Sequence, residues 1–297
     1  MTVHLSPKSL AKAIGASESS LKRWIDAGRI DVARTPGGHR RIEQREALRF
    51  IRDEGMLVVD PAPLELGELA GIGGEGSAQS HHDEALCRAI VSGDAERVRS
   101  LALSMFVAGR RLASLCDGPF AAAMSEVGKL WQHDPDGIHQ EHRATDACIQ
   151  GLERLRSLIP PPPPNAPLAI GAAPGGDTYI IPSLMASMTL LDEQWQAINL
   201  GPNLPIASLE RAIAKYRPDL VWLSVSYEKV MPELLNNLQP LAAKLTEQGG
   251  VLVVGGRAWR APRSTMPDVH SANSMAELAA FAKGIRQARP PSPTSDG

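Results

Sequence analysis

The chain has 297 residues, of which 43% are hydrophobic, and this length exceeds what one hydrophobic core usually supports, so two or three domains are expected. No run of about 18 apolar residues occurs and the N-terminus has no signal-like apolar core, which predicts a cytoplasmic protein without membrane spans. Cys87, Cys116 and Cys148 lie far apart with no CxxC pair. We interpret them as buried free thiols rather than as a zinc site or a disulfide framework.

The net charge of -2 hides an asymmetry along the chain. Residues 1–54 contain eleven Lys or Arg and seven Asp or Glu, so this part carries +4 and the remainder carries -6. Within residues 22–41, six basic residues stand against two acidic ones. A charge run usually marks only a solvated face, but a compact basic segment inside a recognisable motif favours a polyanionic partner.

The first 54 residues are predicted to form short helices and a hairpin. Residues 6–15 begin with Ser-Pro and end with Gly, which is typical of a short helix, and residues 18–27 form a second, amphipathic helix that also stops at a glycine. Residues 34–42 place Pro and two Gly between two short extended arms, and residues 43–53 read as a third amphipathic helix. This order predicts a winged helix-turn-helix head.

The next part of the chain is predicted to be a linker followed by a helical bundle. Residues 55–80 contain six glycines and no sustained hydrophobic period, which predicts a flexible linker. Residues 81–159 return to helical periodicity with three breaks, and four helices are the simplest interpretation. The prolines of residues 160–164 then favour a stiff polyproline spacer.

Short apolar runs alternate with helical periods in the C-terminal part. Strands are expected at residues 168–172, 195–200, 220–225 and 251–254, and helices at 183–192, 206–216, 231–248 and 274–287. This alternation predicts a doubly wound parallel Rossmann-like sheet over residues 165–288, before a disordered tail at 289–297. The expected fold is thus an α/β multidomain protein with a winged helix-turn-helix head, a four-helix bundle and a Rossmann-like domain, whose ligands lie beyond the carboxyl ends of the strands.

Residues 1–54 resemble the MerR family of DNA-binding regulators, most specifically through the segment Arg34-Thr35-Pro36-Gly37-Gly38-His39-Arg40-Arg41. The resemblance implies a double-stranded DNA operator as partner, with one helix in the major groove and cations on the phosphates. The candidate DNA-binding residues are Ser19, Ser20, Lys22 and Arg23 on the recognition helix and Arg34, His39, Arg40 and Arg41 in the wing. We interpret Trp24 as a core residue.

The usual MerR regulator continues with a long dimerisation helix, whereas this chain continues with the glycine-rich residues 55–80. Pairing of two DNA-binding heads must then come from the C-terminal module. We therefore expect self-association through that module, under the control of whatever it senses.

The C-terminal part resembles the sensor of the cobalamin-dependent, light-responsive MerR regulators of carotenoid genes. Trp131 is followed after nine residues by Glu141-His142, a pattern that in this family covers the upper face of adenosylcobalamin. The segment 173–182 keeps Asp177 of the family's lower-ligand motif, but Tyr179 stands where the family has the cobalt-ligating His and Pro182 where it has Gly. The cofactor-site residues that the resemblance implies are Trp131, Glu141, His142, Asp177, Tyr179, Ser224, Ser226, Gly255 and Gly256, the serines and glycines belonging to the slot for the nucleotide tail.

The tyrosine at position 179 changes the expected metal chemistry. A phenol must lose a proton from a pKa near 10 before it competes with imidazole for cobalt. Three alternatives stay open: cobalamin without the lower His, another tetrapyrrole such as haem, which a tyrosine can ligate, or no cofactor. His133, His139 and His142 are further candidates for ligation, or are surface residues.

The sequence therefore predicts a transcriptional regulator, not an enzyme, in which a tetrapyrrole sensor controls oligomerisation and operator binding. One alternative is a cofactor-independent regulator or antirepressor that uses the sensor domain for protein–protein contacts. Another is a corrinoid-carrying methyltransferase component, which would need the missing His. No catalytic triad, paired-carboxylate or phosphate-loop pattern occurs in a convincing context.

Overall fold

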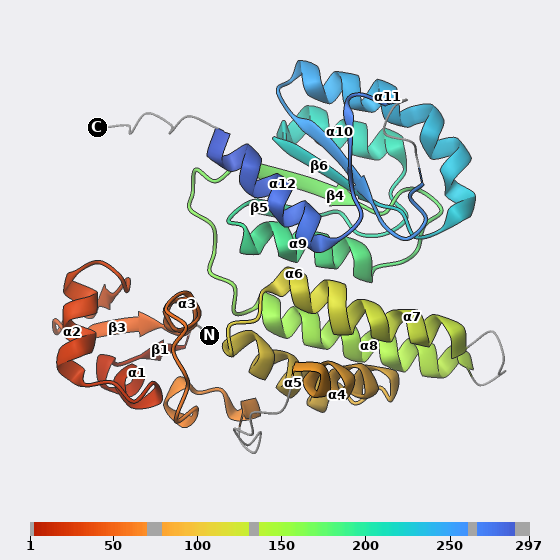
Figure 1. The fold of residues 1–297 in the computed structure, drawn as a ribbon. Helices are drawn as coiled ribbons and strands as arrows, with labels where there is room; N and C mark the ends of the chain where they lie inside the picture. The colour runs from red at the N-terminus through yellow and green to blue at the C-terminus, as the bar shows by residue number, and fades with distance from the viewer. Residues whose placement is uncertain (1–2, 70–78, 131–136, 261–265, 289–297) are drawn as a thin grey trace. The chain divides into compact units, whose positions relative to one another are not determined.

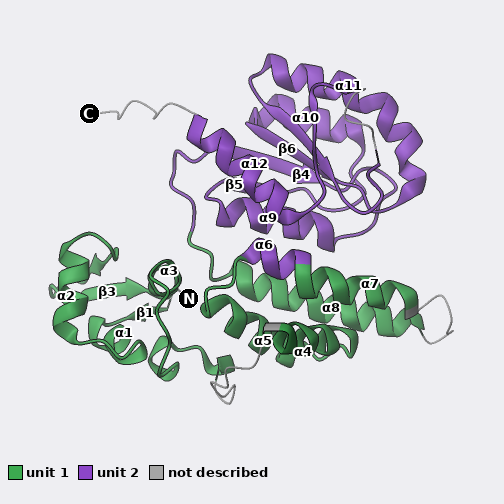
Figure 2. Ribbon diagram, viewed as in Figure 1, with its two compact units in different colours: residues 1–111, 118–160 green, residues 112–117, 161–297 purple. Residues whose placement is uncertain are grey.

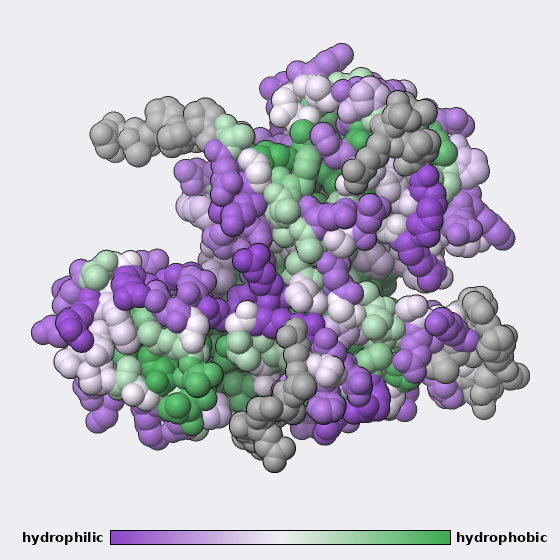
Figure 3. Space-filling model, viewed as in Figure 1, coloured by the Kyte–Doolittle hydropathy of each residue, from purple (hydrophilic) through white to green (hydrophobic). Residues whose placement is uncertain are grey.

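The structure, a computed structural model, describes residues 3–69, 79–130, 137–260 and 266–288 (Figure 1). The chain forms two compact units, one of residues 1–111 with 118–160 and one of residues 112–117 with 161–297 (Figure 2). Hydrophilic residues cover much of the visible surface of each unit (Figure 3). None of the described helices is long and apolar enough to cross a membrane.

The first elements are three short helices and a small antiparallel sheet. The helices are α1 (Pro7–Ala13), α2 (Glu18–Asp26) and α3 (Gln44–Asp53), and the strands β1 (His4–Leu5), β2 (Ala33–Arg34) and β3 (Arg40–Glu43) lie in the order β1-β3-β2. The helix starts follow from capping, because the Ser6 and Ser17 side chains accept hydrogen bonds from the backbone N–H groups of Ser9 and Ser20. The sequence-predicted order of two helices, a hairpin and a third helix is thus present.

Residues 55–69 differ from the flexible linker that the sequence predicts over residues 55–80, whereas residues 70–78 lie outside the described residues. Residues 55–69 contain two 3₁₀ turns, η1 (Ala62–Leu64) and η2 (Gly67–Leu69), and the leucines at 64, 66 and 69 are buried. The Gln44 side-chain amide donates a 2.7 Å hydrogen bond to the Leu64 carbonyl. The glycine count drew attention away from these three leucines, which anchor residues 60–69 within the first unit by burying apolar surface.

The helical region consists of α4 (Gln79–Val91), α5 (Ala95–Val107), α6 (Leu112–Leu115), η3 (Cys116–Phe120), α7 (Ala121–Leu130) and α8 (Gly137–Arg156). Helices α5 and α8 pack closely at Gly151, where an added Cβ would lie 2.5 Å from a methyl group of Val98. Non-helical backbone at Gly118 kinks η3 before Pro119, and α6 belongs to the second unit. Cys116 and Cys148 are buried as expected, whereas Cys87 is half-buried.

The second unit is built on a five-stranded parallel sheet with the order β5-β4-β6-β7-β8. Its elements are β4 (Leu168–Ala172), α9 (Ile181–Asp192), β5 (Gln196–Asn199), α10 (Ile206–Tyr216), β6 (Leu220–Ser224), η4 (Glu228–Val230), α11 (Met231–Glu247), β7 (Val251–Gly255), β8 (Val269–Ala272) and α12 (Met275–Ala288). The mixed α/β fold and parallel sheet agree with the sequence prediction. The sequence missed the edge strand β8, because its short, partly exposed Val-His-Ser-Ala run has no strong apolar pattern.

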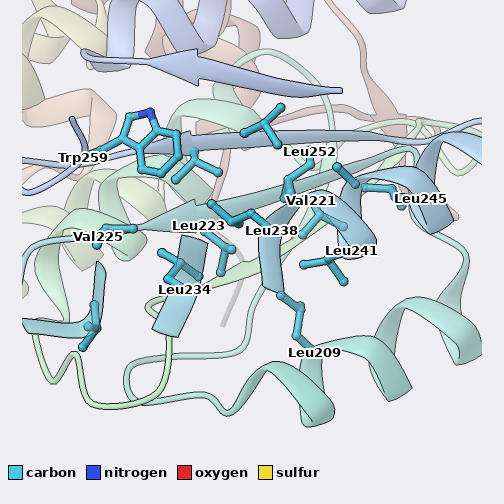
Figure 4. Close-up of a cluster of buried hydrophobic side chains, with 14 of the residues drawn as sticks. Leu209, Val221, Leu223, Val225, Leu234, Leu238, Leu241, Leu245, Leu252 and Trp259 are labelled. Atoms are coloured by element: carbon cyan, nitrogen blue, oxygen red, sulfur yellow. The ribbon is translucent and has the colours of Figure 1, made fainter. Parts of the chain in front are cut away.

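Alternate residues of the central strands face two different apolar layers. Val221 and Leu223 of β6 pack with Leu238 of α11 on one face of the sheet (Figure 4). Leu220 and Trp222 belong to the layer on the other face, which includes residues of α9 and α12. Side chains of a strand alternate between faces, so Ser224 shares the α9 and α12 face with Trp222.

Candidate functional site

A cationic surface lies on α2 and on the β2–β3 hairpin of the first unit. On α2, Ser19, Lys22 and Arg23 are exposed and Ser20 is half-buried. Arg23 donates to the Ser20 hydroxyl at 3.3 Å. The helix therefore presents two cations and two hydroxyl groups along a surface-facing stretch of a little over one turn.

The hairpin brings four further candidates to the surface. Arg34, His39 and Arg41 are exposed, whereas Arg40 is half-buried. The Thr35 backbone N–H donates to the His39 carbonyl at 3.0 Å, and the Thr35 hydroxyl accepts from the His39 N–H at 3.2 Å. These bonds close the turn and hold the two arms of the hairpin together.

Arg40 differs from the other cations because it has an acidic partner. Its Nη2 lies 2.7 Å from Oδ1 of Asp26, the last residue of α2. The ion pair joins the hairpin to the helix, so Arg40 orients the two cationic elements relative to each other. Trp24 is half-buried and its ring lies 5.3 Å from that of Phe50, which agrees with a packing role.

The candidates for the upper face of a cofactor lie on α8, in the first unit. Glu141 is half-buried, and His139 and His142 are exposed. Trp131 and His133 lie outside the described residues. Within the described ranges, no three His, Cys, Asp or Glu side chains gather as a metal site.

Asp177 lies at the carboxyl edge of the sheet in the second unit and is fully buried. Its Oδ2 accepts hydrogen bonds from the backbone N–H groups of Ser226 and Tyr227 at 2.5 and 3.0 Å, and its Oδ1 accepts from the Tyr179 N–H at 3.1 Å. The carboxylate therefore joins the loop after β4 to the loop after β6. These three donors are the structural reason for an acidic residue at this position.

Tyr179 contacts a cation that the sequence analysis did not select. The guanidinium carbon of Arg257 lies 4.5 Å from the centre of the Tyr179 ring, and the Arg257 Nε donates to the Ser226 carbonyl at 3.0 Å. A guanidinium over a phenol ring is a favourable cation–π arrangement. The only available signal was the position of Arg257 directly after the Gly255-Gly256 pair.

Pro182 stands in the first turn of α9, where no backbone donor is needed. The proline therefore fits the helix start that the structure has at this point. Tyr179 and Pro182 are therefore both compatible with the local structure around them.

The glycine pair after β7 has a backbone role. A Cβ on Gly255 would lie 2.1 Å from the Ala272 carbonyl oxygen, and one on Gly256 would lie 2.3 Å from that of Val225. Gly256 also has φ +106°, which side-chain-bearing residues rarely adopt. Neighbouring backbone thus fills the space beside both glycines, and Ser224 and Ser226 are buried next to them.

These residues do not fit a cobalamin held by a lower imidazole. Position 179 supplies a phenol already stacked with Arg257, and the carboxylate of Asp177 is committed to three backbone donors. Backbone occupies the space beside Gly255 and Gly256. The Asp177 carboxylate and the Tyr179 ring thus have partners within the described part of the chain.

The helical region carries the deciding similarity to known proteins. Residues 83–156 match the family model described as the B12 binding domain. The chain is also 23% identical over 240 residues to the HTH-type transcriptional repressor CarA of Myxococcus xanthus, covering 78% of this chain and 80% of that protein. It is 26% identical over 273 residues to the HTH-type transcriptional repressor CarH of the same organism, covering 84% and 88%.

A solved structure shares the fold. The monomethylamine corrinoid protein of Methanosarcina barkeri superposes with a TM-score of 0.57 at 20% identity, covering 70% of this chain and 100% of that one. The similarity supports a helical region followed by a parallel Rossmann-like sheet, as in that corrinoid protein. The similarity to the two repressors extends over most of the chain.

Proposed function

We propose that this protein is a DNA-binding transcriptional regulator with a MerR-type head and a corrinoid-responsive C-terminal part. Residues 1–54 form the winged helix-turn-helix DNA-binding domain, residues 81–159 the cofactor cap, and residues 165–288 the Rossmann-like domain. The proposal rests above all on one observation: a B12 binding domain match lies in a chain whose N-terminal helix and hairpin expose a set of cations. The similarity to two transcriptional repressors supports it.

The DNA-binding role is assigned to the surface of α2 and the hairpin. Lys22, Arg23, Arg34 and Arg41 are exposed and supply positive charge for phosphates, while Ser19, Ser20 and His39 supply hydrogen-bonding groups. Glu18 and Ser19 in the N-terminal turn of α2 are exposed, as contacts with bases or phosphates require. The ion pair between Arg40 and Asp26 holds the hairpin in a fixed orientation relative to α2.

The salt dependence of DNA binding tests this assignment. Arg41→Ala should weaken binding to a random-sequence duplex and reduce the slope of log K against log salt by about one, because one phosphate contact fewer releases fewer counterions. Fluorescence anisotropy over a salt series measures both quantities. Arg286→Ala, which removes an exposed cation from α12, is the matched control. An unchanged affinity and slope for Arg41→Ala would remove the hairpin from the DNA-binding surface.

The sensing role is assigned to a corrinoid bound without a lower histidine. We propose Glu141 and His142 of α8 as contacts of its upper face, on the resemblance of their spacing from Trp131. Titration of the protein with adenosylcobalamin, followed by absorption spectroscopy and gel filtration in the dark and in light, tests binding and its effect on self-association. Glu141→Ala should lower the affinity, and equal affinity would exclude this contact.

A cofactor-independent regulator or antirepressor is the second candidate, and the self-contained bonding of Asp177, Tyr179 and Arg257 favours it. In that case the C-terminal part would act through protein contacts. A spectrum without tetrapyrrole bands after addition of adenosylcobalamin and of haem would support this candidate. A band from haem alone would instead identify Tyr179 as an iron-ligand candidate.

A further inference from the structure

Trp222 fills an unusual position in the central strand β6. The side chain is 2% exposed and lies on the sheet face that carries α9 and α12. Its neighbour on β4 is Gly171, where an added Cβ would lie 2.0 Å from Cδ2 of the indole. The indole therefore covers the backbone of the adjacent strand, and any side chain at position 171 would displace it.

The indole is held in one orientation by a polar chain. Its Nε1 donates to the Ser183 hydroxyl at 3.1 Å, and that hydroxyl donates to Oδ1 of Asn199 at 2.9 Å. The same oxygen accepts from the Gly201 N–H at 3.0 Å. A buried indole N–H needs such a partner, so Ser183 and Asn199 favour a bicyclic ring with a donor at its edge.

Small residues in the layer around the indole leave room for a large ring. Ala169 of β4, Ala186 of α9 and Ala282 of α12 belong to the same buried layer as Trp222. Small residues on facing elements leave room between sheet and helices, and close packing requires that a large group fill it. The chain supplies that group itself.

Trp222 lies on the same face as Ser224, which the sequence assigned to a nucleotide-tail slot. The two side chains are two residues apart on one strand, or about 6.6 Å along it. Ser224 is nearer the carboxyl end, where ligands of parallel sheets enter. A group that passed Ser224 along this face would next meet the indole.

We propose that the space between the sheet and helices α9 and α12 is a bicyclic-ring site that Trp222 occupies permanently. Trp222 thereby acts as a specificity-determining residue that denies the site to the base of a nucleotide tail. A corrinoid bound by this protein keeps its tail outside the sheet, and corrinoids with and without a tail bind alike. The second statement rests on the proposed corrinoid sensing, whereas the ring site does not.

The first experiment removes the indole side chain from the ring site. Trp222→Gly should lower the melting temperature, and added indole should raise it again, because the free ring restores the packing and the hydrogen bond to Ser183. Benzimidazole, which keeps a ring N–H, should stabilise more than naphthalene. The matched control is Leu238→Ala, a cavity on the opposite face, which should show no preference for rings with an N–H.

If Trp222→Gly folds poorly, its refolding yield with and without indole is measured instead. Indole in the refolding buffer should then increase the fraction of folded protein over that obtained with naphthalene. Absence of any effect of indole on both melting temperature and yield would overturn the ring site.

The second experiment compares full-length protein binding cobalamin and cobinamide, a corrinoid without the nucleotide tail, by calorimetry. The wild type should bind both with affinities within about threefold, whereas Trp222→Gly should prefer cobalamin by about tenfold or more. A wild type that prefers cobalamin tenfold would overturn the exclusion of the tail. If the wild type binds neither corrinoid, the proposed corrinoid sensing fails, while the indole experiment still decides the ring site.

Discussion

Two neighbouring arginines have different roles because their surroundings differ. Arg40 is paired with Asp26 at 2.7 Å and is half-buried, while Arg41 is exposed. An ion pair that is partly exposed contributes about 0–1 kcal/mol to stability. Its larger consequence is geometric, because it sets the hairpin against α2, so Arg41 is the better probe of phosphate contacts.

The cysteines allow a second test at the residue scale. Burial raises the pKa of the Cys148 thiol to about 12, and burial together with the nearby Glu126 carboxylate raises the pKa of Cys87. At pH 8 Cys87 should react with a thiolate-selective disulfide reagent faster than Cys148, because it is half-buried rather than buried.

A substitution of Glu126 tests whether its charge slows the reaction of Cys87. Glu126→Gln should speed the reaction of Cys87, since removing the negative charge lowers the pKa of the thiol and increases the thiolate fraction. Stopped-flow absorbance at pH 7 to 9 measures the rates. A slower reaction in Glu126→Gln would contradict the electrostatic cause.

At the scale of elements, the segment with η1 and η2 fastens parts of the first unit together. Turn η1 packs on α1 and η2 on α5, and Glu68 forms an ion pair with Arg154 of α8 at 2.7 Å. Residues 60–69 thereby form a structured strap that contacts both the head and the helical region.

Leu64 tests this strap. Its side chain is fully buried, so Leu64→Ala should lower the free energy of unfolding by about 2–5 kcal/mol through lost burial and a residual cavity. Urea unfolding followed by circular dichroism measures the change. Leu57→Ala is the control, because Leu57 is 81% exposed and its truncation should have little effect. If both substitutions had equally small effects on the free energy of unfolding, these residues would instead be a flexible linker.

A helix cap in the second unit comes from a distant part of the chain. The Asp117 carboxylate accepts hydrogen bonds from the backbone N–H groups of Met275 and Ala276 at 2.7 and 2.9 Å, at the start of α12. Asp117→Ala should cost about 1 kcal/mol, as expected for a lost N-cap, while Asp117→Asn should retain much of the stability. Thermal unfolding of the three proteins measures this. Equal stability of Asp117→Ala and wild type would show that the cap contributes nothing.

At the scale of the whole molecule, DNA binding and self-association are expected to reside in different parts. A fragment of residues 1–66 retains α1 to α3 and η1 with the buried Leu64 and Leu66. It should fold as a monomer and bind DNA more weakly than the full chain, because two linked heads on one duplex raise the effective concentration of the second. Light scattering and anisotropy measure the two properties, and a stable dimer of the fragment would place pairing in the head.

Local signals determined much of this protein from its sequence alone. Ser6 and Ser17 were recognisable as helix starts because a cap is satisfied within three residues, and the alternation of apolar runs with helical periods predicted the parallel sheet. The cations of α2 and the hairpin were likewise visible as a charge cluster, although their DNA contacts stay a prediction. In each case the information is short-range.

Only the tertiary structure decided which residues use their chemistry within the protein. Asp177 bonds to a loop about fifty residues away, Arg257 stacks on Tyr179, and Trp222 covers Gly171 on the neighbouring strand. These contacts join positions far apart in sequence, whose proximity follows from strand order and register rather than from any local pattern. Whether a buried group is free to meet a ligand or is already satisfied by its neighbours is therefore settled by packing, because the interior leaves no room for both.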